Sequence, residues 1–224
     1  GTGRVELTHA NIYSGPTQVE AGTLALSGAG SIANSSGVDL CDCGVFDISA
    51  TSSGATIQSL SGEGAVKLGD KTLTLSNASG IYAGAISGTG GLVLDGGYET
   101  LSGNSTYLGG TTVNGGTLEV GDAGHPSASI QGNVQVNAAG TLRGHGSIAG
   151  NVDNTGTVWP GGSIGTLTIN GNYTQSPGGT LQVEISPTEA SQLKVGGTAT
   201  LAGTLSLLYG PGTYTTKNYT LLTA

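Results

Sequence analysis

The chain is poor in charged and aromatic residues. Among its 224 residues there is no Met, one Trp and one Phe, and 9% of the residues are charged. Six Lys and Arg stand against 14 Asp and Glu, which gives a formal net charge of -8. Nucleic acid binding needs a clustered basic face that neutralises phosphates. The composition therefore argues against nucleic acid, and equally against an anionic membrane surface, as a partner.

The sequence also lacks an apolar run near the ~20 residues that a membrane-spanning helix requires. Its first residues, GTGRVELT, do not have the pattern of a signal peptide. If the protein is exported, we expect its signal to have been removed or to lie outside this sequence.

Cysteine is scarce, and both copies lie in one segment, LCDCG, as Cys41 and Cys43. Corresponding segments elsewhere read LSGAG and LSGEG, so the two Cys replace a Ser/Gly turn. Two Cys without a His nearby in sequence cannot form a zinc site alone. We expect a solvent-facing turn with free thiols or a small strained local disulfide. A metal or redox role and an intermolecular crosslink are the alternatives.

Glycine, by contrast, is abundant, with 43 copies placed at the turns of a repeat. The segments LTHANIYSGPTQVEAGTLAL (residues 7–26) and LSGNSTYLGGTTVNGGTLEV (residues 101–120) align without a gap. They share Leu7/Leu101, Tyr13/Tyr107, Gly15/Gly109, Thr17/Thr111, Val19/Val113, Gly22/Gly116, Thr23/Thr117 and Leu24/Leu118. A period of roughly 20 residues, built from short alternating strands and Gly turns, is typical of a solenoid.

A GTLxL pattern recurs along the chain and predicts how the solenoid is built. It occurs at residues 22–26, 116–120, 165–169, 179–183 and 203–207. Alternate side chains of a strand point to opposite faces, so one rung has few inward apolar groups and needs its neighbours to cover them. Crossover β units are overwhelmingly right-handed. We therefore predict an all-β chain that forms a right-handed parallel β-helix of about nine or ten rungs. The residues expected to be buried are Leu24, Leu26, Leu118, Val120, Leu167 and Ile169.

The organisation of the sequence changes after Asp122. Residues 1–122 carry the approximate repeats, GDAGHPSASIQGN is a short polar interruption, and the remainder is less repetitive. We predict a β-helix stem over residues 1–122 and C-terminal rungs over residues 123–224, continuous with the stem. The faint helical pattern of residues 187–193 is expected to be a capped turn between strands.

Two parts of the chain resemble a known family. Residues 101–121 resemble the autotransporter-associated β-strand repeat. The segments GHGSIAGNV, NTGTVWPGGSIGTLTINGNYTQ and GGTLQVEI resemble the C-terminal part of pertactin-like autotransporter passengers. The resemblance implies a right-handed parallel β-helix whose last stretch is an autochaperone that folds first outside the outer membrane. It also implies display on, or secretion from, a Gram-negative bacterium, with the protein's own outer-membrane translocator barrel as partner.

The chain departs from this family in two places. Trp159 stands before a Pro-Gly turn where the family usually has a small residue, so a large ring is expected at a corner, across the turn or as a contact surface. The sequence also stops at YTLLTA, where relatives continue towards a barrel. We therefore expect a fragment of a longer protein, or its cleaved end.

The chemical motifs do not combine into an active site. Residues 161–165, GGSIG, fit the GxSxG pattern around Ser163, but that motif works on a strand-to-helix turn with a His base. Here a strand follows, and no His lies within fifteen residues. The densest carboxylates are Asp39, Asp42 and Asp47, and the cations that a lyase would need, Arg4 and Arg143, are remote in sequence. We predict a non-enzyme without catalytic, cofactor-binding or metal-binding residues.

The remaining polar and aromatic candidates have structural interpretations. His9, His125 and His145 are isolated among small residues and are expected in solvated loops, with metal binding or pH sensing as the alternative. Tyr13 and Tyr107 share a repeat position, which favours packing within the rungs over a sugar-binding platform.

The predicted function is a structural stem and folding template of a secreted or surface-displayed passenger, presenting an upstream effector domain, and the protein is expected to be a monomer. One alternative is an adhesin whose rod binds a host protein or glycan as its surface ligand, with Trp159 as the visible candidate. A β-helix polysaccharide-active enzyme is the other alternative.

Overall fold

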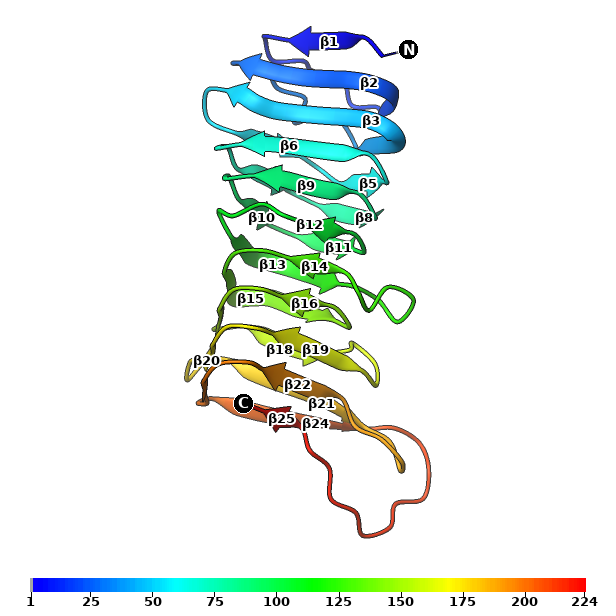
Figure 1. The fold of residues 1–224 in the computed structure, drawn as a ribbon, viewed down its shortest axis with the longest axis vertical. Helices are drawn as coiled ribbons and strands as arrows, with labels where there is room; N and C mark the ends of the chain where they lie inside the picture. Colours follow the sequence, from blue (N-terminus) through cyan, green and yellow to red (C-terminus); the bar gives the residue numbers. More distant parts are fainter. Residues whose placement is uncertain (1) are drawn as a thin grey trace.

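The computed structural model describes residues 2–224 and shows strands stacked along one long axis, with the N-terminus at one end and the C-terminus near the other (Figure 1). Within that range every regular element is a strand. Accordingly, residues 2–224 contain no helix long and apolar enough to cross a membrane. The strands form a parallel β-solenoid of about 10 turns, which confirms the predicted fold class.

Each turn of the solenoid passes through three faces in the same order. Face 1 contains the starts of β2 (Thr17–Gly28) and β3 (Val38–Thr51), then β5 (Leu60–Gly62), β8 (Ala78–Tyr82), β11 (Gly97–Leu101), the ends of β13 (Thr111–Val120) and β15 (Val134–Gly144), β18 (Thr157–Pro160), β21 (Thr180–Ile185) and β24 (Thr204–Tyr209). Its strands pair in parallel with the turns above and below.

Face 2 follows face 1 along the chain. It contains β1 (Arg4–Leu7), the middle parts of β2 and β3, β6 (Ala65–Gly69), β9 (Ala85–Gly88), β12 (Asn104–Ser105), β14 (Ser129–Ile130), β16 (Ser147–Ile148), β19 (Thr166–Ile169), β22 (Gln192–Val195) and β25 (Leu222–Thr223). A hydrogen bond of 2.8 Å from the Thr106 amide to the Ile86 carbonyl links β9 to the turn that contains β12.

Face 3 completes the turn. It contains β4 (Ala55–Ile57), β7 (Leu73–Leu75), β10 (Leu92–Leu94), the starts of β13 and β15, β17 (Val152–Asn154), β20 (Tyr173–Gln175) and β23 (Ala199–Thr200). The strands β13 and β15 bend around the corner from face 3 to face 1. At such a corner Gly116 has a φ of 73°, and a Cβ there would lie 2.2 Å from the Gly97 carbonyl oxygen, so only Gly fits.

The core is a single apolar column inside the three faces. On face 1, Leu118, Leu142, Val158 and Leu181 stack in register, and all are buried. Of the predicted core residues, Leu26, Leu118, Val120, Leu167 and Ile169 are buried, as expected. Leu24 is only half-buried and packs against the edge of the core, because β1 alone lies above it. In the last turn, Leu205 is 54% exposed because no further turn covers it.

The turns differ in length, and the extra residues are in loops. Leu142 pairs with Leu118, 24 residues earlier, but with Val158 only 16 residues later. The longer turn includes the loop of residues 121–128, which projects from the corner between β13 and β14 (Figure 1). Residues 187–193 likewise contain a turn, in which the Ser186 Oγ accepts the Glu189 amide at 2.9 Å, before β22 begins. The expected capped turn is therefore confirmed.

The C-terminal turns contain two polar arrangements that link consecutive rungs. At one corner, each Asn Oδ1 accepts a backbone amide of the next turn: Asn133 from Asn151 at 2.9 Å, Asn151 from Asn172 at 2.8 Å, and Asn172 from Thr198 at 2.9 Å. We call this the Asn ladder. Each step satisfies a backbone donor that the β pairing leaves free.

Inside the same turns, Asn154, Tyr173 and Gln175 form a buried network. Asn154 Nδ2 donates to the Tyr173 hydroxyl at 3.1 Å, and that hydroxyl donates to Gln175 Oε1 at 2.9 Å. Gln175 Nε2 donates in turn to the Thr204 carbonyl at 3.0 Å. Because its polar atoms are paired, this network joins three turns without leaving unsatisfied groups.

Candidate functional site

A column of outward side chains on face 1 has the strongest mixture of charge and aromatic surface. Strand pairing places Thr100, Glu119, Arg143 and Trp159 in one register position on four successive turns. Tyr98 lies two residues before Thr100 on β11 and therefore points to the same side. We call Tyr98, Thr100, Glu119, Arg143 and Trp159 the Tyr98–Trp159 patch.

An ion pair lies at the centre of the patch. Arg143 Nε and Nη2 lie 3.0 and 2.9 Å from Glu119 Oε1. The other carboxylate oxygen of Glu119, Oε2, accepts the Tyr98 hydroxyl and the Thr100 hydroxyl, the latter at 3.2 Å. Glu119 is only 5% exposed. Its charge is therefore matched by Arg143, and both of its oxygens are already bonded.

Two aromatic rings hold the Arg143 guanidinium. Its Cζ lies 5.7 Å from the Tyr98 ring centroid and 5.1 Å from that of Trp159, within the range of a cation–π interaction. The backbone of Gly162 closes a further side, since a Cβ there would lie 2.0 Å from Arg143 Nε. Burial, followed by the hydrogen bond to Glu119, raises the pKa of Tyr98 to about 12, so its hydroxyl remains a donor at neutral pH.

The position of Trp159 differs from the expectation. The ring is not at a corner, because β18 continues to Pro160 and the turn begins only at Gly161. Trp159 therefore lies on a flat strand face, half-buried beside Arg143, and its Nε1 has no hydrogen-bond partner among the described residues. The alternative expectation, a contact surface, is the one that this position favours.

Beside the patch, face 1 has a row of Thr hydroxyls that we call the Thr row. It consists of Thr117, Thr141, Thr157, Thr180 and Thr204, which pair in register on successive turns. Tyr98 pairs with Thr117 and so stands at one end of the row. The first four Thr are half-buried and Thr204 is exposed. In the described part of the chain, none of these hydroxyls hydrogen-bonds to another protein group.

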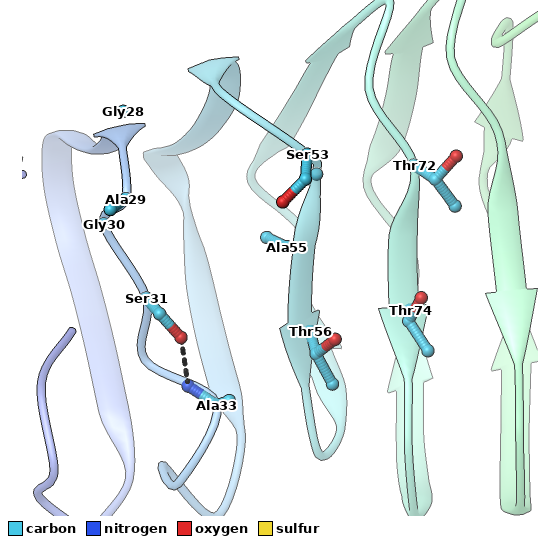
Figure 2. A pocket seen from close by; sticks show the side chains of 11 residues that line it. Gly28, Ala29, Gly30, Ser31, Ala33, Ser53, Ala55, Thr56, Thr72 and Thr74 are labelled. Atoms are coloured by element: carbon cyan, nitrogen blue, oxygen red, sulfur yellow. Dashed lines mark hydrogen bonds between the residues drawn. The ribbon is translucent and has the colours of Figure 1, made fainter. Parts of the chain in front are cut away.

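A shallow hollow of about 260 Å³ lies nearer the N-terminus (Figure 2). Its polar side chains are hydroxyls: Thr56 and Thr74 lie on the paired strands β4 and β7, and Ser31 Oγ accepts the Ala33 amide at 3.2 Å on the opposite side. The remaining lining is Gly and Ala, with Ser53 and Thr72 at the rim. Since the lining has no titratable side chain, the hollow offers no group for acid–base catalysis.

The Cys corner agrees with one of the predicted states. Cys41 and Cys43 are exposed and free, in β3 where the register against β2 shifts. Residual desolvation and then the charge of Glu20 raise the pKa of the Cys41 thiol, and an interaction with Asp42 raises that of Cys43. Across residues 2–224, no group of three or more His, Cys, Asp and Glu side chains is arranged to hold a metal ion.

Ser163 lies exposed on the turn between β18 and β19, and a strand follows it as predicted. His145 is remote from Ser163 in sequence but lies close to its turn in the structure. A Cβ on Gly165 would lie 2.2 Å from His145 Cε1, so this imidazole packs against the same turn. The nucleophile-elbow motif also needs a helix after the Ser, and β19 stands there instead. The Ser163 carbonyl accepts the Ser191 hydroxyl at 2.8 Å, which explains the turn as a structural corner.

The acidic candidates do not converge. Asp39 accepts the Ser61 hydroxyl at 2.8 Å on face 1, whereas Asp47 lies on face 2. Asp47 pairs at 2.9 Å with Arg4, which is remote in sequence but adjacent in space. Burial acts to raise the pKa of Asp47, but hydrogen bonds from Ser49 and Arg4 outweigh it and lower that pKa. The Asp39–Ser61 bond links neighbouring turns, whereas the Arg4–Asp47 pair reaches across β2, which lies between β1 and β3.

The shared Tyr position is structural. The Tyr107 hydroxyl lies 2.6 Å from Thr111 Oγ1 and is buried, and the Tyr13 hydroxyl lies 2.8 Å from Thr17 Oγ1. Each pair therefore closes the corner of its own turn. Tyr13 is 40% exposed only because fewer strands surround it at the end of the solenoid.

One buried titratable residue escaped the sequence analysis. Glu99 lies inside the core column between Gly80 and Leu118, fully buried, and neither carboxylate oxygen has a hydrogen-bond partner among residues 2–224. Burial raises the pKa of Glu99 to about 8, and the nearby backbone of Leu60 and Gly80 offsets only part of this effect. Aligning GYETL with GTLEV places Glu99 at the inward Leu position, which is the signal that would have revealed it.

The chain is therefore a parallel β-solenoid with a patch of paired charges and aromatic rings on one face. A family model described as the passenger-associated-transport-repeat matches residues 1–26 and 87–120. Over 118 residues the chain is 42% identical to the adhesin BmaC autotransporter of Brucella suis biovar 1 (strain 1330). That match covers 46% of this chain and 3% of the relative, so the chain spans a small part of its relative's length. No solved structure matches the chain.

The match to residues 87–120 confirms the resemblance of residues 101–121 to an autotransporter-associated repeat. Together with the solenoid, both matches support the similarity of this chain to autotransporter passengers.

Proposed function

We propose that this chain is the structural stem of a passenger and holds an upstream effector domain away from the cell surface. The observation that carries the proposal is the continuous parallel pairing of successive turns on face 1, which makes an elongated body without a converged set of catalytic groups in residues 2–224. Because each turn of a solenoid stacks on its neighbours, the stack holds its two ends apart along the axis.

In this proposal, residues 123–224 are the folding template. The Asn ladder and the buried Asn154–Tyr173–Gln175 network support it, because both link successive C-terminal turns through bonds that form only when the turns are stacked. A template of this kind gives the next turn a fixed edge on which to pair. This reduces the entropy lost when that turn folds.

The partner in this proposal is the protein's own C-terminal translocator barrel, and the location is the surface or the surroundings of a Gram-negative bacterium. The passenger-associated repeat and the name of the Brucella relative, an autotransporter, support both points. We propose a monomer, because one chain covers its own core in the turns between the two ends of the column.

The test is deletion within the full-length gene in its own host. Removing the codons for residues 123–224 should abolish protease-accessible passenger at the cell surface, whereas removing residues 1–122 should leave it displayed. Surface protease accessibility and immunoblotting measure both. Normal display without residues 123–224 would overturn the template role, and loss of display in both deletions would overturn the division into stem and template.

A second candidate function, an adhesive rod, is favoured by the Tyr98–Trp159 patch. Tyr98 is 39% exposed and Ile81, which pairs with Thr100, is 61% exposed, so the patch presents apolar area next to bonded charges. Such a mixture is typical of contact surfaces. The test compares the binding of the purified wild-type chain and of the Tyr98→Ala variant to host cells. Equal binding by the two proteins would show that the patch is not the adhesive surface.

A further inference from the structure

We propose that the outer surface of face 1 binds a neutral glycan strand, which lies along the solenoid axis over the Thr row and beside Tyr98 and Trp159. This inference goes beyond the stem role and rests on the adhesive candidate, for which it names the ligand class.

The charges of the surface favour a neutral ligand. The only formal charges in the patch are Arg143 and Glu119, and they cancel each other through two short contacts. The carboxylate of Glu119 is saturated by Arg143, Tyr98 and Thr100. The whole chain has a net charge of -8, which repels sulfated or uronic acid polymers. A ligand with many hydroxyls and no charge fits this surface best.

The Thr row supplies the matching polar groups. Each Thr hydroxyl can donate one hydrogen bond and accept others, as a sugar hydroxyl does. Because the row follows the parallel pairing, its hydroxyls recur at the strand spacing of about 4.8 Å. That interval is close to the length of one pyranose residue in an extended glycan. The hydroxyls of Thr141 and Thr157 have no protein partner among the described residues, so they are available for such a ligand.

The aromatic rings supply the apolar contacts. The C–H faces of sugar rings pack against aromatic side chains, and Tyr98 and Trp159 stand on either side of Arg143. The Arg143 guanidinium, which Gly162 contacts on a further side, packs against both rings before any ligand arrives. A fixed surface loses little conformational entropy on binding, and this favours affinity.

Two other surfaces lack one or more of these properties. On face 3, the corresponding outward row of Thr112, Gln135, Asp153 and Thr174 contains an acidic residue and no aromatic ring. The hollow of Figure 2 has hydroxyls but no aromatic ring. A protein partner would need an apolar centre, which the Thr row does not offer. Face 1 therefore combines the three features in one place.

The test compares the wild-type chain with the double variant Thr141→Val/Thr157→Val on an array of neutral gluco-, galacto- and manno-oligosaccharides, beside sulfated and uronic acid oligosaccharides. Val keeps the β-branched shape and removes only the hydroxyl. We expect binding to a neutral member and a loss of about tenfold in affinity in the double variant, as for two lost hydrogen bonds. Thr174→Val on face 3 is the matched control and should bind as the wild type does.

Two further measurements keep the result interpretable. Trp159→Phe retains an aromatic plane and should retain binding, and the melting curves of all variants should match the wild type. No binding to any neutral glycan, binding only to anionic ones, or unchanged affinity in the double variant would each overturn the inference. If host-cell binding persists in those cases, the adhesive function survives with another ligand, and if it is also absent, both fail.

Discussion

Two buried polar sites, one in each half of the solenoid, differ in how their groups are paired. In the C-terminal turns, Asn154, Tyr173 and Gln175 satisfy one another and the backbone across three turns. In the N-terminal half, Glu99 lies at an inward position with no hydrogen-bond partner in the described chain. The same architecture therefore contains a polar network that fixes the stacking of turns and a carboxyl group that weakens it. The difference teaches that stability in this rod is local, because each turn contacts only its neighbours.

The largest expected effect is at Glu99. Its pKa is about 8 in the folded state against an ordinary value of 4.5, so the folded state keeps a proton that the unfolded state loses between these values. The contribution of Glu99 to stability should therefore be most favourable below pH 4.5, decrease as the pH rises to 8, and stay level above it. Glu99→Gln should remove this slope and stabilise the N-terminal half at pH 9 by up to about 5 kcal/mol.

Urea denaturation followed by circular dichroism at several pH values between 4.5 and 9 measures this slope. Glu184→Gln, which removes an outward carboxyl on β21, is the control and should retain it. An equal slope in the wild type and in Glu99→Gln would show that Glu99 does not weaken the N-terminal turns.

The next effect concerns the buried network. Asn154→Ala leaves the Tyr173 hydroxyl and the Thr180 carbonyl without their partner inside the core. We expect a destabilisation of the C-terminal turns by about 3 kcal/mol, since a buried unsatisfied group costs about 1–3 kcal/mol. Urea titration of the variant against the wild type provides the measurement. A change in the free energy of unfolding below about 0.5 kcal/mol would show that the network is not the source of C-terminal stability.

A smaller effect is expected at the exposed Asn ladder. Asn151→Ala removes one side-chain acceptor at a corner that solvent reaches, so it should cost about 1 kcal/mol. Limited proteolysis in rising urea, with mass identification of the fragments, should show a surviving core from about residue 125 onward in the wild type. The same core should disappear at lower urea in the variant. Survival of the N-terminal half instead would reverse the comparison.

The last substitution, at Ser163, is expected to have no effect on activity. Ser163→Ala should leave the rates with ester, peptide and polygalacturonate substrates at background, as in the wild type, because Ser163 belongs to a structural corner. Turnover that disappears with this substitution would mean that the neighbouring His145 acts as a base.

The sequence was sufficient to predict the architecture. The GTLxL pattern and the Gly corners identified the solenoid, its approximate number of turns and most of its core, because each repeats a local rule of strand alternation. The errors arose where residues that are adjacent in space, but not in sequence, determine the burial or position of a side chain. Leu24 is half-buried because of what lies above it, and Trp159 lies on a strand because β18 runs one residue beyond the expected corner.

The surfaces were less predictable for the same reason. Turn lengths vary: 16 residues separate Leu142 and Val158, 24 separate Leu118 and Leu142, and 29 separate Leu193 and Leu222. A fixed period therefore cannot align Glu119, Arg143 and Trp159, or bring His145 to the turn of Ser163. The patch and the Thr row became visible only when the pairing register was known.

The variable turn lengths also have a practical consequence for protein engineering. The loop of residues 121–128 accommodates extra chain while Leu118 and Leu142 stay in register on either side. An exposed loop whose ends are held by paired strands is a favourable place for an insertion. A peptide epitope placed after Gly124 should therefore be presented on the side of the rod at a fixed height, which would make this solenoid a molecular ruler for surface display.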